Sequence, residues 1–282
     1  MARLFGRAFS GAQAKGGSGM TFHQTLTPLL TAVGAAALLA LIGASTAAAQ
    51  SACPAGFRSA TGDSFGIPVC ATERVSDRAL EHAASVMNRL LDFDRNGTPD
   101  SQPVLAQLRD SGAFYAVFPN ERAVDRFFDR LDDSQHNTYE ASVVVMEDEM
   151  DISGREGWDP TIEEALHVIT QFGYAEVFPE AFGEFRGSAI ADLMDAARGG
   201  YHARVPNRYP AGAVYTYDDR SCDYGCQVTE FTFWAITSMR GLNRNRADEI
   251  GDEWRLHTPE LMESRAPGLV ALLSDPRFGI LF

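Results

Sequence analysis

The amino-acid sequence predicts an α+β fold, in which helices dominate and a small sheet belongs to the same single domain. Apolar residues recur at helical spacing in most segments after residue 75. Runs rich in aromatic and β-branched residues, which favour strands, occur at 113–118, 141–146 and 213–217. The part of the 282-residue chain that follows residue 49 is long enough for one sizeable core. We therefore expect residues 50–282 to form one globular domain.

Residues 1–49 predict a secretory signal peptide, because they follow its order of charge and polarity. Arg3, Arg7 and Lys15 precede an apolar run at 29–42, no acidic residue occurs, and small residues up to Ala49 offer a cleavage site. The apolar run is shorter than the ~20 residues that span a bilayer. We expect an exported protein, periplasmic or extracellular, that starts at Met1 or Met20 and has no stable membrane insertion after cleavage.

The helices are predicted from apolar faces and their capping residues. The first runs from Ser76, a natural N-cap, to Leu91, and others are expected at 103–110 and 121–131. An E-E-x-x-H helix over 161–173 begins near Asp159 or Thr161 and is expected to end at Gly173. Further helices are predicted at 189–197, 228–239, 246–254, 259–263 and 267–273, whereas residues 51–73 have no clear pattern.

The charge of the chain restricts its partners. The first 49 residues hold three of the 24 basic residues, so 21 basic residues remain against 38 acidic ones, a formal charge of −17. A surface this acidic argues against nucleic acid and anionic membranes as partners and favours divalent cations.

Four cysteines predict two disulfides. An even count in an exported protein is typical of disulfides, and the grouping favours Cys53 with Cys70 and Cys222 with Cys226. A zinc cluster is the alternative, but C-x16-C and C-x3-C are not zinc-finger spacings.

The loop at 92–100 has the ligand spacing of a calcium-binding turn. Asp92, Asp94, Asn96 and Asp100 occupy positions 1, 3, 5 and 9 of an EF-hand loop, with a glycine at position 6. Position 12 is Pro103 instead of the bidentate glutamate. The truncated pattern resembles the calcium turns of dockerins and thrombospondin-like repeats, which implies a structural Ca²⁺ site. An Asp- and Asn-rich turn between two helices is the other interpretation.

The sequence Glu163-Glu164-Ala165-Leu166-His167 resembles the zincin motif H-E-x-x-H, with glutamate in place of the first histidine. Glu163 and His167 keep the spacing of two zinc ligands on one helical face, and Glu164 holds the position of the general base. The resemblance implies a third ligand on a later helix, and Glu230 is the one carboxylate of the apolar segment 229–236. A tyrosine hydroxyl from Tyr215, Tyr217 or Tyr224 would stabilise an oxyanion.

Two other interpretations of this helix stay open. Glu163, Glu164 and His167 also fit the solvated side of an ordinary amphipathic helix, with acids in its first turn favoured by the helix dipole. A di-iron bundle would use Glu164 and His167 as E-x-x-H, but the sequence contains only one such motif.

Several sequence blocks together resemble a family of exported, mostly uncharacterised proteins from marine bacteria and unicellular eukaryotes. They are Asp-Phe-Asp-Arg-Asn-Gly, Glu-Glu-Ala-Leu-His-Val-Ile-Thr-Gln-Phe-Gly-Tyr, Asp-Ala-Ala-Arg-Gly-Gly, Thr-Tyr-Asp-Asp-Arg-Ser-Cys-Asp-Tyr-Gly-Cys and Thr-Glu-Phe-Thr-Phe-Trp-Ala-Ile-Thr-Ser. The resemblance covers roughly 75–282 and implies one domain with a shared site, without naming a reaction.

The sequence supports two functional hypotheses. The first is a degenerate zincin-like metallohydrolase that acts on peptide or protein substrates, with Zn²⁺ held by Glu163, His167 and Glu230 and water activated by Glu164. The alternative is a non-enzymatic, calcium-stabilised binding protein of the extracellular space or envelope.

Overall fold

The computed structural model describes residues 53–62, 64–155 and 157–282, without the side chains of Asp133 and Ser134. The signal-peptide prediction for residues 1–49 lies outside this part of the chain. The described residues belong to one compact unit with the predicted α+β architecture. None of their helices is both long and apolar enough to cross a bilayer.

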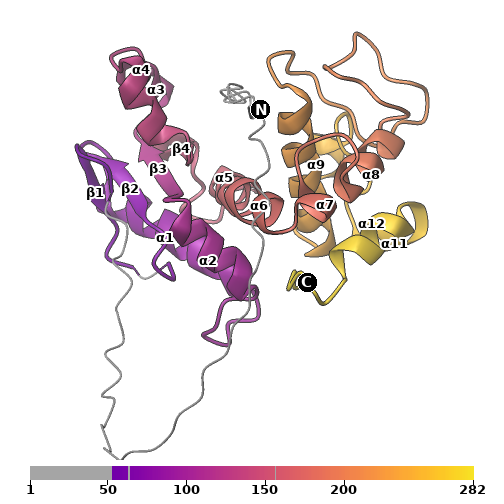
Figure 1. Cartoon of the computed structure of the whole chain (residues 1–282), viewed down its shortest axis with the longest axis horizontal. Helices are drawn as coiled ribbons and strands as arrows, with labels where there is room; N and C mark the ends of the chain where they lie inside the picture. Colours follow the sequence, from indigo (N-terminus) through magenta and orange to yellow (C-terminus); the bar gives the residue numbers. More distant parts are fainter. Residues whose placement is uncertain (1–52, 63, 156) are drawn as a thin grey trace, which may run out of the picture. The chain divides into compact units, whose positions relative to one another are not determined.

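The small sheet has four strands in the order β1-β2-β3-β4 (Figure 1). They are β1 (Phe57–Ser59), β2 (Val69–Thr72), β3 (Phe114–Phe118) and β4 (Ser142–Met146). β1 pairs antiparallel with β2, and β2, β3 and β4 are parallel. The predicted strands at 113–118 and 141–146 are confirmed. The prediction that 51–73 is irregular was wrong, because β1 and β2 form there, and the Cys53–Cys70 disulfide links the residues before β1 to β2.

Both faces of β3 are buried, which its apolar sequence requires. Tyr115 and Val117 point into the main core. Phe114 and Phe118 point to the other face, where they pack against aromatic residues of β1 and of the segment between β3 and β4. The sheet is therefore covered on both sides and positions the helices that follow.

The helices of the first half connect and cover the sheet. They are α1 (Asp77–Leu91), α2 (Gln102–Asp110), α3 (Glu121–Phe128) and α4 (Asp133–His136), followed by the 3₁₀ turns η1 (Asn137–Tyr139) and η2 (Glu147–Glu149). Ser76 caps α1 as predicted, since its hydroxyl accepts a hydrogen bond from the amide of Ala79 at 3.1 Å. α1 packs against β2, β3 and the helix α5 (Pro160–Ile169).

The helix with the E-E-x-x-H motif does not end at Gly173. α5 runs into a π-helical turn, η3 (Thr170–Tyr174), and then into α6 (Ala175–Val177). Gly173 keeps a negative φ inside this turn, and a Cβ atom there would lie 2.7 Å from Cγ1 of Val104 on α2. The glycine therefore permits close packing of two helices, and the prediction of a helix stop was wrong.

The second half is built around α9 (Tyr224–Met239), whose residues are mostly buried. The surrounding helices are α7 (Pro179–Phe182), α8 (Ala189–Ala197), α10 (Ala247–Ile250), α11 (Pro259–Arg265) and α12 (Pro267–Leu273). Asp223 caps α9 by accepting a hydrogen bond from the amide of Cys226 at 3.0 Å, so this helix begins four residues before the prediction. α5, α8, α11 and α12 all contact it.

Two predictions in the second half were wrong. Residues 213–217 form no strand, and Tyr215 makes only an isolated bridge to Trp254. The helix predicted over 246–254 is limited to α10, because the chain then turns to pair with Tyr215. The predicted disulfide between Cys222 and Cys226 is present. Both disulfides indicate an oxidising environment.

Candidate metal centre

The start of α5 is fixed by Asp159. Its carboxylate accepts a hydrogen bond from the amide of Thr161 at 3.1 Å and contacts Nε2 of His82, on α1, at 2.6 Å. Pro160 supplies the first helical residue, where its missing amide hydrogen costs nothing. The helix then places Glu163 and His167 one turn apart on the same face.

That face of α5 is covered by α9 and is not a solvated surface. The His167 side chain is only 9% exposed, and the Glu164 and Glu230 side chains are 22% and 13% exposed. The ring of His167 packs edge-on against Phe233 of α9, with 5.8 Å between ring centroids. The interpretation of this side as ordinary polar surface is therefore wrong.

The three predicted ligands meet in space. One ligand atom from each of Glu163, His167 and Glu230 lies within 4.8 Å of the other two. Nε2 of His167 is 3.6 Å from Oε2 of Glu230. Ligand atoms around a tetrahedral zinc, each bound at 2.0–2.2 Å, lie about 3.4 Å apart. The cluster could therefore hold a metal ion with small side-chain movements.

Nε2 of His167 is buried and has no hydrogen-bond partner. A buried ring nitrogen without a hydrogen-bond partner destabilises the folded state, and such nitrogens are rare in native proteins. This nitrogen faces a carboxylate, and an imidazole nitrogen with two carboxylates is a suitable ligand set for a divalent cation. The residues present therefore fit a metal ion.

Glu164 lies on the other side of the imidazole ring. Its Oε2 is 3.4 Å from Nδ1 of His167. A carboxylate in this position favours the tautomer that carries its proton on Nδ1 and leaves Nε2 free to bind a metal. Glu164 therefore contacts His167 on the side away from Glu230, and its predicted role as general base stays a prediction.

The carboxyl groups of the centre hold their protons more tightly than usual. Burial, with the neighbouring Glu149, raises the pKa of Glu164 to about 8. Burial also raises the pKa values of Glu163 and Glu230; the charge of Glu164 adds to the shift of Glu163 and that of Glu163 to the shift of Glu230, while His167 opposes both shifts. Several carboxylates in so small and dry a space are stable only with a counter-charge or with bound protons. A divalent cation would supply the counter-charge.

Of the three candidate tyrosines, only Tyr217 contacts the centre. Its hydroxyl is hydrogen-bonded to Glu230, and burial followed by the charge of that carboxylate raises its pKa. Tyr215 is fully buried and donates to the carbonyl oxygen of Gln227 at 2.9 Å. Tyr224 donates to Asp195 at 3.2 Å.

Glu253 is a further carboxylate of this region that the sequence did not single out. Its Oε1 accepts a hydrogen bond from the indole nitrogen of Trp234 at 2.8 Å. Trp234 follows Glu230 by one helical turn, so the two side chains share a face of α9. Burial, and then the Glu163 carboxylate, raise the pKa of Glu253 to about 7, although the bond from Trp234 opposes this.

Glu184 approaches His167 from the segment between α7 and α8. Its carboxylate accepts a hydrogen bond from the hydroxyl of Thr229, the residue before Glu230. Burial raises its pKa, and Thr229 and His167 lower it. Neither Glu184 nor Glu253 lies in a recognisable motif, so only the fold could identify them.

The calcium-type loop adopts the turn that its sequence predicts. Asp92 accepts hydrogen bonds from the amides of Asn96 at 3.0 Å and Gly97 at 2.9 Å. Gly97 has a φ of 84°, which favours glycine. Carboxylate oxygens of Asp92, Asp94 and Asp100 lie within 4.8 Å of one another and could hold a metal ion. Burial raises the pKa of Asp100 to about 6.

The potential ligand oxygens of the loop already accept hydrogen bonds within it. Oδ1 of Asn96 accepts a hydrogen bond from the amide of Thr98 at 2.8 Å. Both carboxylate oxygens of Asp100 lie 3.1 Å from the amide of Phe93. Position 12 is Pro103, inside α2, and supplies no carboxylate.

Comparisons of this chain with protein-family models, curated proteins and solved structures gave no match. The assignment of its function therefore depends on the geometry of its own residues.

Proposed function

We propose that this chain is an exported metal-binding protein of the metallohydrolase class, with a degenerate zincin-like centre that acts on peptide bonds. The observation that carries the proposal is the buried, unpartnered Nε2 of His167, which faces Glu230. Two carboxylates and one imidazole are suitable ligands for Zn²⁺, and three protein ligands leave a coordination position for water or substrate. A zinc ion there would polarise a substrate carbonyl and lower the pKa of bound water.

The surrounding residues support hydrolytic chemistry. The buried carboxyl of Glu164 is next to His167 and has a pKa raised to about 8, within reach of neutral pH, which suits a group that accepts and returns a proton. The hydroxyl of Tyr217 donates to Glu230 and, once Glu230 binds the ion, would turn to donate a hydrogen bond to a developing oxyanion. We propose Glu164 as the base and Tyr217 as this donor.

The variant Glu164→Gln tests the role of the base. Gln cannot accept a proton at neutral pH, but its amide oxygen keeps a polar acceptor next to Nδ1 of His167. We expect the variant to retain zinc and to lose at least 100-fold in hydrolysis of an unfolded protein substrate, measured by release of free amines. Full activity in the variant would show that Glu164 only orients the histidine.

The alternative function is a calcium-stabilised binding protein without catalytic activity. The turn at 92–100 favours it, because Asp92 organises the loop around a space bordered by three carboxylates. Elemental analysis of the purified protein separates the two functions. One equivalent of zinc supports the hydrolase, whereas calcium alone supports the binding protein.

A further inference from the structure

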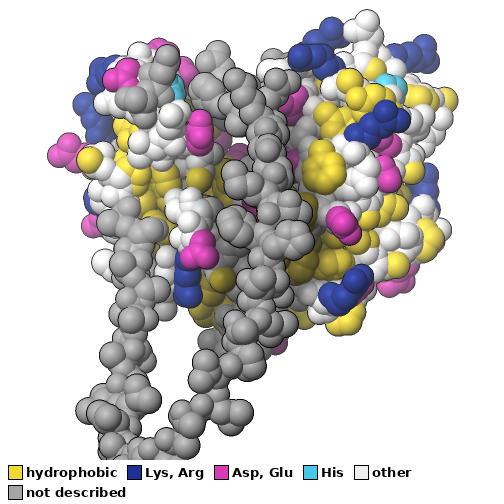
Figure 2. Space-filling view, viewed as in Figure 1, with side chains coloured by type: hydrophobic (Ala, Val, Ile, Leu, Met, Phe, Trp, Pro, Cys, Tyr) yellow, Lys and Arg dark blue, Asp and Glu magenta, His cyan; other side chains and the backbone are white. Residues whose placement is uncertain are grey.

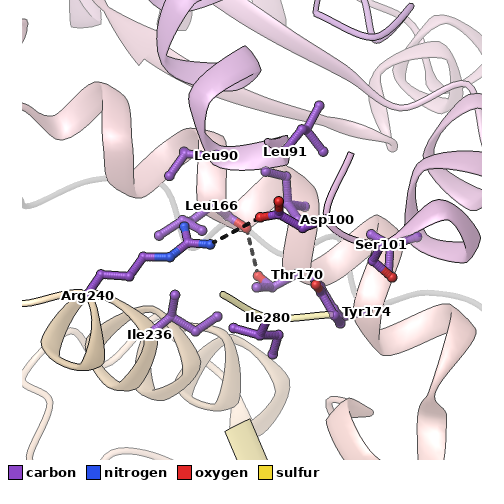
Figure 3. A pocket seen from close by; sticks show the side chains of 12 residues that line it. Leu90, Leu91, Asp100, Ser101, Leu166, Thr170, Tyr174, Ile236, Arg240 and Ile280 are labelled. Carbon is purple, nitrogen blue, oxygen red and sulfur yellow. Dashed lines mark hydrogen bonds and ion pairs between the residues drawn. The ribbon is translucent and has the colours of Figure 1, made fainter. Parts of the chain in front are cut away.

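A second polar site lies in a cavity between the calcium-type loop and α9 (Figure 3). The cavity has a volume of about 20 Å³, and one water molecule needs roughly 10–15 Å³ on this measure. Its polar side chains are Asp100, Ser101, Thr170, Tyr174 and Arg240. The remaining walls are apolar and come from α1, α2, α5, α9 and the C-terminal segment: Leu90, Leu91, Val104, Leu166, Ile169, Ile236 and Ile280.

Arg240, which follows α9 directly, is the group in this cavity that requires explanation. Its side chain is only 4% exposed. Nε donates a hydrogen bond to the carbonyl oxygen of Leu281 at 3.0 Å, and the guanidinium lies over the ring of Phe93, 4.1 Å from its centroid. Nη2 is 4.0 Å from Oδ2 of Asp100. Nη1 is buried and has no hydrogen-bond partner.

A buried guanidinium nitrogen without a hydrogen-bond partner destabilises the folded state more than a neutral polar atom in the same position, because it carries part of a positive charge. Burial lowers the pKa of Arg240 to about 10, so the group stays cationic at neutral pH. Asp100 compensates this charge only in part, since its nearest oxygen lies 4.0 Å from Nη2, beyond hydrogen-bonding distance. The cavity therefore offers a charged donor and room for one small acceptor.

We propose that this cavity binds a monoatomic anion of the halide class, chloride, through Nη1 of Arg240. A halide is only slightly larger than water, and the apolar walls exclude a hydrated polyatomic anion. The hydroxyls of Ser101 and Tyr174 border the same space and could donate further hydrogen bonds. Thr170 is less available, because its hydroxyl already donates to the carbonyl oxygen of Leu166 at 2.9 Å.

The bound anion would connect segments far apart in sequence. Arg240 contacts the calcium-type loop through Phe93 and Asp100, and the C-terminal segment through Leu281. By offsetting the cost of burying the guanidinium, the anion would hold Arg240 in contact with all of these segments. The inference does not depend on the proposed hydrolytic function, since no ligand of the zinc-type cluster lines the cavity.

Bromide, which scatters anomalously, tests the site directly in crystals of the wild-type chain soaked in sodium bromide. We expect one anomalous peak within hydrogen-bonding distance of Nη1 of Arg240. In solution, replacing gluconate by chloride at constant ionic strength should raise the midpoint of thermal unfolding by about 2–4 °C at saturation.

The variant Arg240→Lys should lose the chloride-dependent rise, because an ammonium cannot make the contacts of Nε and Nη1 together. Arg244→Lys is the matched control, since Arg244 is exposed and pairs with Glu260. This control should keep the rise. If Arg240→Lys does not fold, the bromide map of the wild type decides alone. Cavity density without anomalous signal, with equal midpoints in chloride and gluconate, would overturn the proposal.

Discussion

At the scale of single residues, His167 has the defining position in the candidate centre. Its ring lies between Glu164 at Nδ1 and Glu230 at Nε2, with Phe233 against its edge. The two nitrogens therefore face different carboxylates, an arrangement that would orient the ring to bind the proposed ion through Nε2. Glu230, on a helix far along the chain, completes the arrangement.

The position of Glu253 predicts that this residue contributes to zinc affinity. Its carboxylate is held by Trp234 near Glu163, and it adds negative charge next to the proposed ligands. We expect Glu253→Gln to weaken zinc binding about 10-fold, within the 10–100-fold range of changes around metal ligands. Competition titration with a chromophoric chelator measures the affinity. Glu263→Gln, on the exposed side of α11, is the control, and equal affinities of both variants would exclude Glu253 from the centre.

The sequence indicated some of these residues and not others for a physical reason. Glu230 was identifiable because a lone carboxylate in an apolar helix must find a partner. Glu253 was not, because it belongs to a segment whose pattern predicted a helix and which instead pairs with residue 215. Its position is set by long-range contacts that no local pattern contains.

At the scale of elements, the helix predictions were most successful where capping residues and apolar faces agreed, as in α1. The π-helical turn η3 was not predictable, because Gly173 has the sequence signature of a helix end and acts through its contact with Val104. π-Turns often occur at functional sites. This one begins three residues after His167, at the end of α5, and carries Gln171, which donates to Thr229 at 3.3 Å.

Calcium binding at the calcium-type loop is expected to raise the thermal stability of the protein. Weak extracellular calcium sites have dissociation constants of about 10⁻⁴–10⁻³ M. Calcium at ten times its dissociation constant should stabilise the protein by about 1.4 kcal/mol. This corresponds to a rise of about 3–5 °C in the unfolding midpoint. Differential scanning calorimetry with calcium, magnesium or EDTA measures it.

Asp94→Asn should remove most of this rise, since Asp94 is an exposed member of the carboxylate group. Asp110→Asn changes an exposed aspartate outside the loop, and this variant should keep the calcium-dependent rise in the unfolding midpoint. A midpoint that does not respond to calcium in the wild type would identify 92–100 as a turn without a bound ion.

At the scale of the whole molecule, negative charge has two different distributions. Figure 2 shows acidic and basic side chains interspersed on the face that it draws, which suits a soluble surface. The carboxyls around His167 are different, because they are close together and largely buried. The composition predicted an affinity for cations, but only the fold shows where the charges gather.

The buried carboxyls predict how stability depends on pH when no metal is bound. The pKa values of Glu164 and Glu253, about 8 and 7, exceed the usual value of 4.5. The folded state therefore binds more protons than the unfolded state between about pH 5 and 8, so stability falls as pH rises through this range. The slope is up to about 1.4 kcal/mol per pH unit for each proton.

Urea unfolding in EDTA at pH 5, 6, 7 and 8 measures this slope. Zinc should reduce the loss of stability at pH 8, because metal binding releases the protons that the carboxyls otherwise hold. Glu253→Gln should flatten the metal-free slope, since it removes one of these titrating groups. A stability that rises steadily from pH 5 to 8 in EDTA would show that the centre is not protonated.

The proposed centre requires a single ion bound between α5 and α9. An anomalous difference map at the zinc absorption edge, from crystals grown with zinc, tests this directly. We predict one strong peak about 2.0–2.2 Å from Nε2 of His167 and from a carboxylate oxygen of each of Glu163 and Glu230. A map without density between these three side chains, at saturating zinc, would contradict the account.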